Sequence, residues 1–324
     1  LDSNERIAVK KIELNGQDVG SLKGIENFLA LTDLYIMENK VKTLNLSNNE
    51  YLTNLSCRDN QLETLDLSKN TYLFFLDCNL NHLTSLDLSK ANAKVSFYAD
   101  NNLAAMNLNE SNQMDLSTLQ GFDVSKASNW IGGSVSGNIL TATSDKVTYD
   151  YDCGKGVTAK FTLAKEREVA INEINFPDDN FREYIKNRFD LNKDDILKGN
   201  EANVQVLNIY GKYISSIKGI EFFPDLRVLN CYNNFIKDID VTKNLELADF
   251  EFDYNEVSTI DVSKNVKLEE FWCPGNKLTH LDVSNNVALI NLYCDNNMLD
   301  RLDLTKNVNL RTLTCSTNML TSLD

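Results

Sequence analysis

The 324-residue sequence has few of the residues that most enzymes use for catalysis. Its only two histidines, His82 and His280, lie in different halves of the chain with no nucleophile at matching spacing. It contains no glycine-rich phosphate loop and no zinc-ligand spacing. Paired acids such as Glu269 and Glu270 would alternate faces on a strand, so they could not converge as a general acid and base. These absences predict that the protein is not an enzyme.

Positive charge and long apolar runs are also scarce. The chain carries 32 Lys and Arg residues against 47 Asp and Glu residues, which gives a net charge of −15. This balance argues against a nucleic-acid partner, because the phosphate backbone would be repelled, and it suits a basic partner. No apolar run reaches membrane-spanning length, so we expect no membrane insertion by these residues.

The sequence does contain a repeat of 21 residues with the pattern LxxLxCxxNxLxxLDLSxNxx. A fixed period in this range is the signature of a solenoid. Apolar residues at repeat positions 4 and 6 predict a short strand with one buried face, and strands of successive coils would stack as a parallel sheet. The nine copies start at Leu31, Leu52, Leu73, Lys94, Leu226, Leu247, Leu268, Leu289 and Leu310.

Asparagine and cysteine recur at fixed repeat positions. Asn occupies position 9 in all nine copies, where we expect its amide to satisfy backbone groups buried by a tight turn. Neighbouring in-register cysteines have poor geometry for a disulfide, so we interpret those at position 6 as buried free thiols. Cys153 lies outside this pattern. The position-6 cysteines are Cys57, Cys78, Cys231, Cys273, Cys294 and Cys315.

The segments LEEFWCPGN (268–276) and LINLYCDNN (289–297) resemble the leucine-rich-repeat consensus. The 21-residue length and the LDLSxN half are similar to the repeats of bacterial cell-surface leucine-rich-repeat proteins. This resemblance implies a recognition function and a cell-surface or secreted location. Because LDLSxN reads as extended, we expect a β-rich leucine-rich-repeat solenoid with a parallel sheet and little helix on its convex side.

The chain contains two related halves, because residues 12–49 align with residues 207–244 without a gap. Residues 176–189 have the pattern of a helix with one apolar face. Alternating apolar residues predict three or four antiparallel strands in the module that follows the first array. We expect a fragment of a longer tandem design, with any export signal or anchor outside it. The predicted parts are a first leucine-rich-repeat array (1–123), an antiparallel β capping module (124–165), a linker with a helical cap and an EF-hand-like loop (166–201), and a second array (202–324).

The segment 190–201, DLNKDDILKGNE, has the oxygen spacing of an EF-hand calcium loop. Asp195 stands where that motif has glycine, which strains the turn without forbidding it. Lys198 supplies no acidic ligand. The pattern predicts a structural Ca²⁺ site; the alternative is a helix-ending turn without metal, and no other cofactor is expected. The predicted ligands are Asp190, Asn192, Asp194, the Ile196 carbonyl and Glu201.

Aromatic and acidic residues gather at repeat positions that face outward from the predicted sheet. Exposed aromatics among polar groups favour a binding surface, although aromatics also suit strands and pack across coils. We predict a non-enzymatic protein-recognition or adhesion module; the alternatives are a carbohydrate-binding module or a spacer. The second array offers Tyr232, Asp249, Glu251, Asp253, Tyr254, Glu269, Glu270, Trp272, Tyr293 and Asp295, and the first array offers Tyr35, Phe74, Phe75 and Tyr98.

Overall fold

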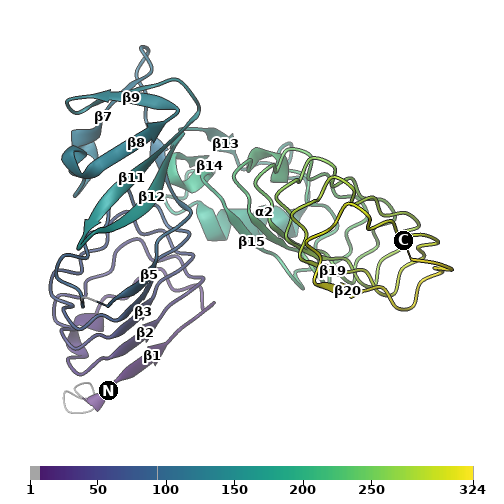
Figure 1. Cartoon of the computed structure of the whole chain (residues 1–324), viewed down its shortest axis with the longest axis horizontal. Coiled ribbons are helices and arrows are strands. Elements are labelled where there is room, and N and C mark those ends of the chain that lie inside the picture. The colour runs from purple at the N-terminus through teal and green to yellow at the C-terminus, as the bar shows by residue number, and fades with distance from the viewer. Residues whose placement is uncertain (1–7, 93, 324) are drawn as a thin grey trace. The chain divides into compact units, whose positions relative to one another are not determined.

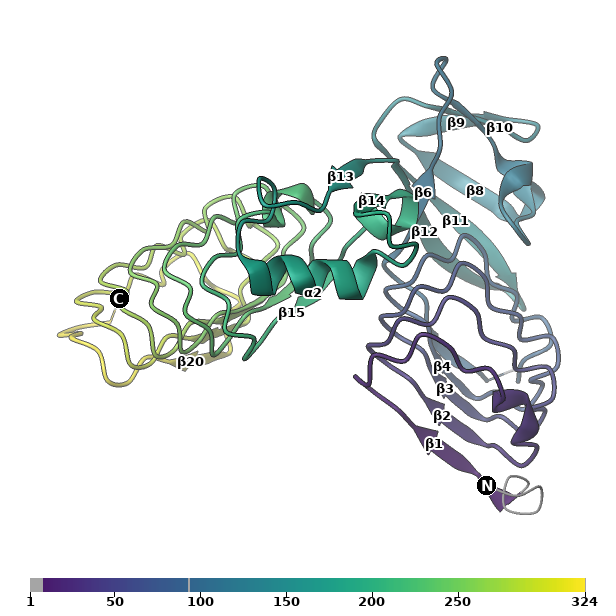
Figure 2. The same cartoon turned by 180° about the vertical axis from the view of Figure 1, so that it is seen from behind.

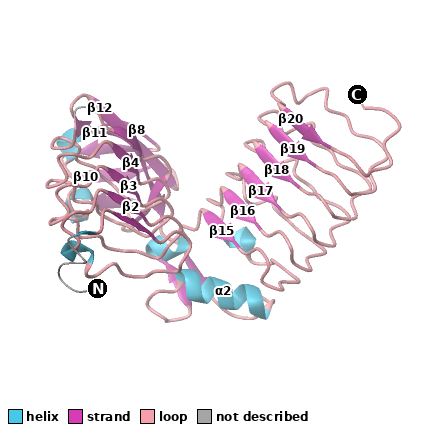
Figure 3. Ribbon diagram, turned by 90° about the horizontal axis from the view of Figure 1, so that it is seen from below, coloured by secondary structure: helices cyan, strands magenta, loops and turns pink. Residues whose placement is uncertain are grey.

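One short strand per coil builds a parallel sheet in each half of the molecule. The computed structural model describes residues 8–92 and 94–323, which divide into two compact units between Arg167 and Glu168 (Figure 1). Each unit stacks its coils so that the strands lie side by side (Figures 2 and 3). The predicted parallel-sheet solenoid is therefore confirmed.

Successive strands of the regular coils pair in register at a constant step of 21 residues, whereas the first coil of each array is one residue longer. In the second unit Leu229, Phe250, Phe271 and Leu292 are cross-strand neighbours, and all are fully buried. The first sheet contains β1 (Lys11–Glu13), β2 (Asp33–Tyr35), β3 (Asn54–Ser56), β4 (Phe75–Asp77) and β5 (Ser96–Tyr98). The second contains β15 (Val206–Asn208), β16 (Val228–Asn230), β17 (Asp249–Glu251), β18 (Glu270–Trp272), β19 (Asn291–Tyr293) and β20 (Thr312–Thr314).

The half of each regular coil that carries LDLSxN contains neither strand nor α-helix among the described residues, as the sequence predicts. The first coil of each array differs. Gly24 and Gly219 have φ angles of 105° and 115°, and each precedes a 3₁₀ turn, η1 (Ile25–Asn27) or η5 (Ile220–Phe222). Among the described residues, none of the helices has the length and hydropathy needed to cross a bilayer.

The position-9 asparagines satisfy the turns, as predicted. The amide of Asn255 donates to the carbonyls of Cys231 and Phe252 at 3.0 and 2.9 Å. Its Oδ1 accepts from the Ile236 N–H at 3.0 Å. The cysteines are free thiols. Burial raises the pKa of the Cys294 thiol to about 12, which keeps it protonated and inert.

Two sheets close the end of the first array. Tyr149 donates a hydrogen bond to the Thr84 carbonyl at 2.7 Å, and Leu88 donates to the Cys153 carbonyl at 2.7 Å, so Cys153 belongs to this junction. The strands are β6 (Asn102–Met106), β7 (Gln113–Asp115), β8 (Ala127–Ile131), β9 (Gly133–Ser136), β10 (Ile139–Ala142), β11 (Lys146–Gly154) and β12 (Val157–Lys165), with the short turns η2 (Leu116–Thr118) and η3 (Val124–Lys126). They pair in the orders β6-β12-β11-β8 and β7-β10-β9.

The predicted antiparallel β module is confirmed, but the predicted number of three or four strands is wrong. Five strands lie between residues 124 and 165, and β12 also pairs in parallel with β6, which lies within the range predicted for the first array. The physical reason is that the fourth coil loses its repeat spacing after Asn102. The following residues, Leu103–Met106, then pair with β12, although the Leu103 N–H still donates to the Asn81 carbonyl of the third coil.

A helical cap begins the second unit. The helix α2 (Asp179–Phe189) is capped by Asp178, whose Oδ1 accepts from the Phe181 N–H at 2.9 Å. The Oδ2 of Asp178 accepts from the N–H and hydroxyl of Ser215, at 2.8 and 2.7 Å, which ties the cap to the first coil. The strand β13 (Glu168–Ala170), which precedes the helix, pairs antiparallel with β14 (Ile196–Lys198), which follows it. The turn η4 (Gly199–Ala202) then leads into the array.

Candidate functional site

The outward face of the second sheet carries a cluster of acids beside two stacked aromatic rings. Asp249 and Glu251 point outward from β17 on either side of the buried Phe250. On the next strand Glu270 lies opposite Asp249, and Trp272 lies opposite Glu251. The rings of Trp272 and Tyr293 stack with centroids 3.7 Å apart and an interplanar angle of 22°. We call Asp249, Glu251, Asp253, Glu270, Trp272 and Tyr293 the acidic–aromatic strip.

The strip holds its carboxylates close together and half-buried. Burial, followed by the charges of Asp249, Asp253 and Glu270, raises the pKa of Glu251 to about 7. Burial also raises the pKa of Asp253. The folded protein therefore holds several carboxylates close enough together that burial and mutual repulsion oppose their ionisation.

Other residues predicted for this site lie elsewhere or have structural partners. Asp295 accepts hydrogen bonds from the hydroxyls of Thr314 and Ser316, so it ties its coil to the next one. Glu269 is exposed and precedes β18. Tyr232 and Tyr254 lie on the turns after their strands rather than on the sheet.

The first array provides an internal comparison for the strip. At the positions equivalent to Asp249, Glu251, Asp253, Glu270 and Trp272 it carries Asn54, Ser56, Arg58, Phe75 and Asp77. Both arrays form the same coils and the same parallel sheet. The sixth strip residue, Tyr293, has Tyr98 as its equivalent. The fold therefore does not require the four acids or Trp272, which are specific to the second array.

Replacing Glu251 with Gln should stabilise the second unit at high pH. The fold raises the pKa of Glu251 to about 7, so it favours the protonated acid over the carboxylate. The free energy of unfolding is therefore highest at low pH and falls as pH rises through about 7. Because Glu251 is only half-buried, screening limits the expected gain for Glu251→Gln at pH 8 to about 1–2 kcal/mol, with none at pH 4. Urea unfolding at both pH values tests this. Glu269→Gln is the exposed control, and an equal effect of Glu251→Gln at both pH values would contradict the prediction.

The side chains of the predicted calcium loop hydrogen-bond within the loop. The Asp190 carboxylate accepts from the N–H groups of Asp194 and Asp195, at 3.2 and 3.1 Å. Asp195, at the position of the EF-hand glycine, has a φ of 61°, so it does adopt the left-handed conformation. The Lys198 ammonium lies 2.6 Å from Asp194 Oδ2. Within residues 8–92 and 94–323, no group of three or more His, Cys, Asp or Glu side chains is arranged to hold a metal ion. Calcium binding by this loop stays a prediction.

Removing the Lys198 charge should strengthen calcium binding, because the ammonium competes with Ca²⁺ for the Asp194 carboxylate. We expect the parent to bind with a Kd on the order of 1 mM and Lys198→Ser to bind about tenfold more tightly. Isothermal titration at constant ionic strength measures both. Lys193→Asn, which keeps a residue suited to the left-handed backbone, is the control. No binding heat and no rise in melting temperature in either protein would contradict calcium binding.

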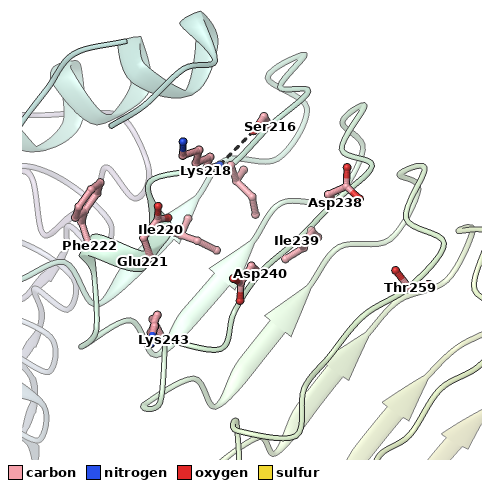
Figure 4. Close-up of a pocket in the computed structure, with 11 residues that line it drawn as sticks. Ser216, Lys218, Ile220, Glu221, Phe222, Asp238, Ile239, Asp240, Lys243 and Thr259 are labelled. Atoms are coloured by element: carbon pink, nitrogen blue, oxygen red, sulfur yellow. Dashed lines mark hydrogen bonds between the residues drawn. The ribbon is translucent and has the colours of Figure 1, made fainter. Parts of the chain in front are cut away.

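The second array also has a groove of about 650 Å³ where its first, atypical coil meets the next coils (Figure 4). Its floor is formed by Ile217, Ile220 and Ile239, which are buried. Its acids serve the local turns, since Glu221 accepts from the Gly219 N–H at 2.6 Å and Asp240 accepts from Thr242 at 2.9 Å. Glu221 and Asp240 therefore stabilise turns at this groove.

Regular coils of 21 residues, each with one strand, a buried leucine face and an asparagine at the turn, define this chain as a leucine-rich-repeat solenoid. No protein-family model matches it, and no curated protein matches it. The assignment follows from the chain's own coils and confirms the leucine-rich-repeat resemblance read from the sequence.

Solved structures with a partial likeness include bacterial leucine-rich-repeat proteins. The functional domain of InlJ from Listeria monocytogenes, described as including a cysteine ladder, is 21% identical over 99% of this chain, with a TM-score of 0.39. The internalin InlF of Listeria monocytogenes is 19% identical over 99% of this chain and 85% of its own, with a TM-score of 0.36. A leucine-rich-repeat protein of Leptospira interrogans is 18% identical over 91% of this chain, with a TM-score of 0.37. The chain spans 57% of the length of the first and third of these.

Proposed function

We propose that the second array is a non-enzymatic protein-recognition module whose acidic–aromatic strip binds a basic segment of a partner protein. The observation that carries this proposal is the specificity of the strip. The chain contains two arrays with the same fold. Only the second array places four acids beside a stacked pair of aromatic rings, Trp272 and Tyr293. We further propose an adhesion or recognition role at a bacterial surface or in secretion, which is supported by the similarity of the repeats to those of bacterial surface proteins.

The chemistry of the strip favours a lysine or arginine at its centre. Burial and then the repulsion of neighbouring carboxylates raise the pKa of Glu251. An incoming cation would offset that repulsion, so cation binding would favour the ionised form of Glu251 and ionisation would favour binding. The neighbouring Trp272 can contribute a cation–π contact of about 0.5–2 kcal/mol. Aromatic residues at the centre of an interface also supply most of the binding energy in many complexes.

Replacing Trp272 with alanine should weaken binding of a basic partner, because alanine removes the aromatic contact without adding a carboxylate to the strip. We expect a loss of about 2 kcal/mol, close to 30-fold in Kd. The probe is a panel of synthetic peptides that differ in the number of Lys and Arg residues, titrated against the full chain. Binding should also weaken as salt rises, because the attraction is screened.

The charge contribution is tested by the double variant Glu251→Gln/Glu270→Gln, with Glu269→Gln as the exposed control. The double variant should lose affinity for the basic peptides and much of its salt dependence, while the control keeps both. Equal binding by the double variant and the parent would exclude recognition through the strip. A failure of every peptide to bind would leave the spacer as the better description.

A further inference from the structure

A second aromatic surface lies on the turns after the strands in the first three coils of the second array. It consists of Tyr210, Tyr213, Tyr232, Phe235 and Tyr254, which we call the aromatic ledge. Exposed fractions are 51% for Tyr210, 74% for Tyr213, 52% for Phe235 and 61% for Tyr254. Large side chains this exposed and this close together are unusual on a protein surface and mark a binding surface more often than chance.

The rings of the ledge form two pairs, each spanning one step of the solenoid. Tyr210 and Tyr232 stack with centroids 5.0 Å apart and an interplanar angle of 6°. Tyr213 and Phe235 lie 6.2 Å apart at 35°. Tyr254 packs directly over Gly275, where an added Cβ would lie 2.7 Å from the ring. The absence of a side chain at Gly275 therefore helps to position the fifth ring.

The fold does not account for these aromatic residues. The equivalent residues in the first array are Asn15, Asp18, Met37, Lys40 and Asp59, and the coils there form equally well. Tyr213 and Tyr254 also have φ angles of 61° and 53°, matching 55° and 52° at the two aspartates.

Aspartate and asparagine tolerate the left-handed conformation better than tyrosine does. The second array thus places tyrosine at two turn positions where the backbone favours a small polar residue. Tyrosine at these two positions lowers local stability, so we attribute the presence of these rings to binding of a ligand.

We propose that the aromatic ledge binds a neutral oligosaccharide. Pyranose rings present C–H groups that stack on exposed aromatic faces, and the phenol groups of Tyr210 and Tyr213 can hydrogen-bond to sugar hydroxyls. Both ring pairs join the same two coils, and their members are three residues apart in each turn, so the pairs offer two stacking positions for sugar units. All five ledge residues are uncharged. Asp253 precedes Tyr254, and the chain has a net charge of −15, so the surroundings disfavour an anionic glycan.

The ledge is distinct from the acidic–aromatic strip in both position and chemistry. The strip lies on β17, β18 and β19, apart from Asp253 just after β17, whereas the ledge lies on the turns that follow β15, β16 and β17. The two surfaces adjoin only at Asp253 and Tyr254. Binding at the strip should fall with salt, whereas stacking of a neutral sugar should not. The two proposals can therefore fail separately.

The experiment uses the full chain and an array of neutral oligosaccharides built from hexose and N-acetylhexosamine units. The strongest binder is then titrated by calorimetry at low and high salt. The test variant is Tyr213→Asp/Phe235→Asp, and a second variant, Tyr213→Asp/Phe235→Lys, places the first-array residues at both positions. We expect both variants to bind at least tenfold more weakly and to keep the parent melting temperature. Trp272→Asp is the matched control and should bind the sugar as the parent does.

The proposal is overturned if no neutral oligosaccharide binds, or if both ledge variants bind as tightly as the parent. It is also overturned if Trp272→Asp loses the sugar to the same extent as the ledge variants, because the sugar would then occupy the strip. Loss of basic-peptide binding in the ledge variants, with no sugar binding by the parent, would assign the ledge to the protein interface instead.

Discussion

Replacing Asn255 with alanine should lower the free energy of unfolding of the second unit by about 3–5 kcal/mol. The amide of Asn255 donates to carbonyls of its own coil and of the preceding coil, and its Oδ1 accepts from the Ile236 N–H. Alanine would leave these buried backbone groups without partners and open a small cavity. Because coils are stabilised by their neighbours, the loss should destabilise the whole array rather than one turn.

Two other asparagines provide matched controls for this prediction. Asn286 at repeat position 19 is also buried; it donates to the Val262 and Asn265 carbonyls, but its Oδ1 has no hydrogen-bond partner among the described residues. Asn286→Ala should therefore cost less than Asn255→Ala. Its neighbour Asn285 is exposed, so Asn285→Ala should change stability by no more than about 0.5 kcal/mol.

The two tryptophans allow each unit to be followed separately. Trp130 lies in the first unit and Trp272 in the second. Urea unfolding in a Trp130→Phe background reports the second unit through Trp272 fluorescence. Equal midpoints for the Asn255 and Asn285 variants would show that the asparagine ladder contributes little to stability.

The period of the sequence made most of this fold predictable. Leu, Cys and Asn at fixed positions specify which side chains are buried in every coil, and Asn255 is satisfied as that pattern predicts. The helix of the cap was also predictable, because Phe181 and Ile185 lie on one face and both are buried. Repetition supplies the same local evidence many times, which makes the expectation robust.

The capping module and the ledge were less predictable. The parallel pairing of β6 with β12 joins segments more than fifty residues apart, and no periodic signal connects them. For the site, the sequence indicated Trp272 and the acids of the strip but not Tyr210, Tyr213 or Phe235. Those residues lie on turns, where strand periodicity says nothing about side-chain direction. Comparison of equivalent positions in the two arrays could have identified them, because the first array has polar or charged residues at these three positions.

A comparison of two equivalent glycines should measure how tightly the helical cap holds the second array. Gly24 and Gly219 precede equivalent 3₁₀ turns, one in each array, and have φ angles of 105° and 115°. At Gly219 an added Cβ would lie 2.3 Å from Cδ1 of Phe176 and 2.7 Å from the Asn175 carbonyl oxygen. At Gly24 the nearest atom would be 3.9 Å away. Both alanine variants share the backbone strain, and only Gly219→Ala adds a collision with the cap.

We therefore expect Gly24→Ala to cost the first unit about 1–2 kcal/mol, from strain at positive φ alone. Gly219→Ala should cost the second unit about 3–5 kcal/mol, because displacing the fully buried Phe176 adds an overpacking penalty to the same strain. Hydrogen exchange should locate the difference, with faster exchange along α2 in Gly219→Ala. If the two variants lose equal stability and α2 keeps its protection, then Phe176 does not hold the cap against the first coil. A larger loss at Gly219 would instead show that the cap is part of the array's cooperative unit, since its displacement would expose the apolar end of the coils to water.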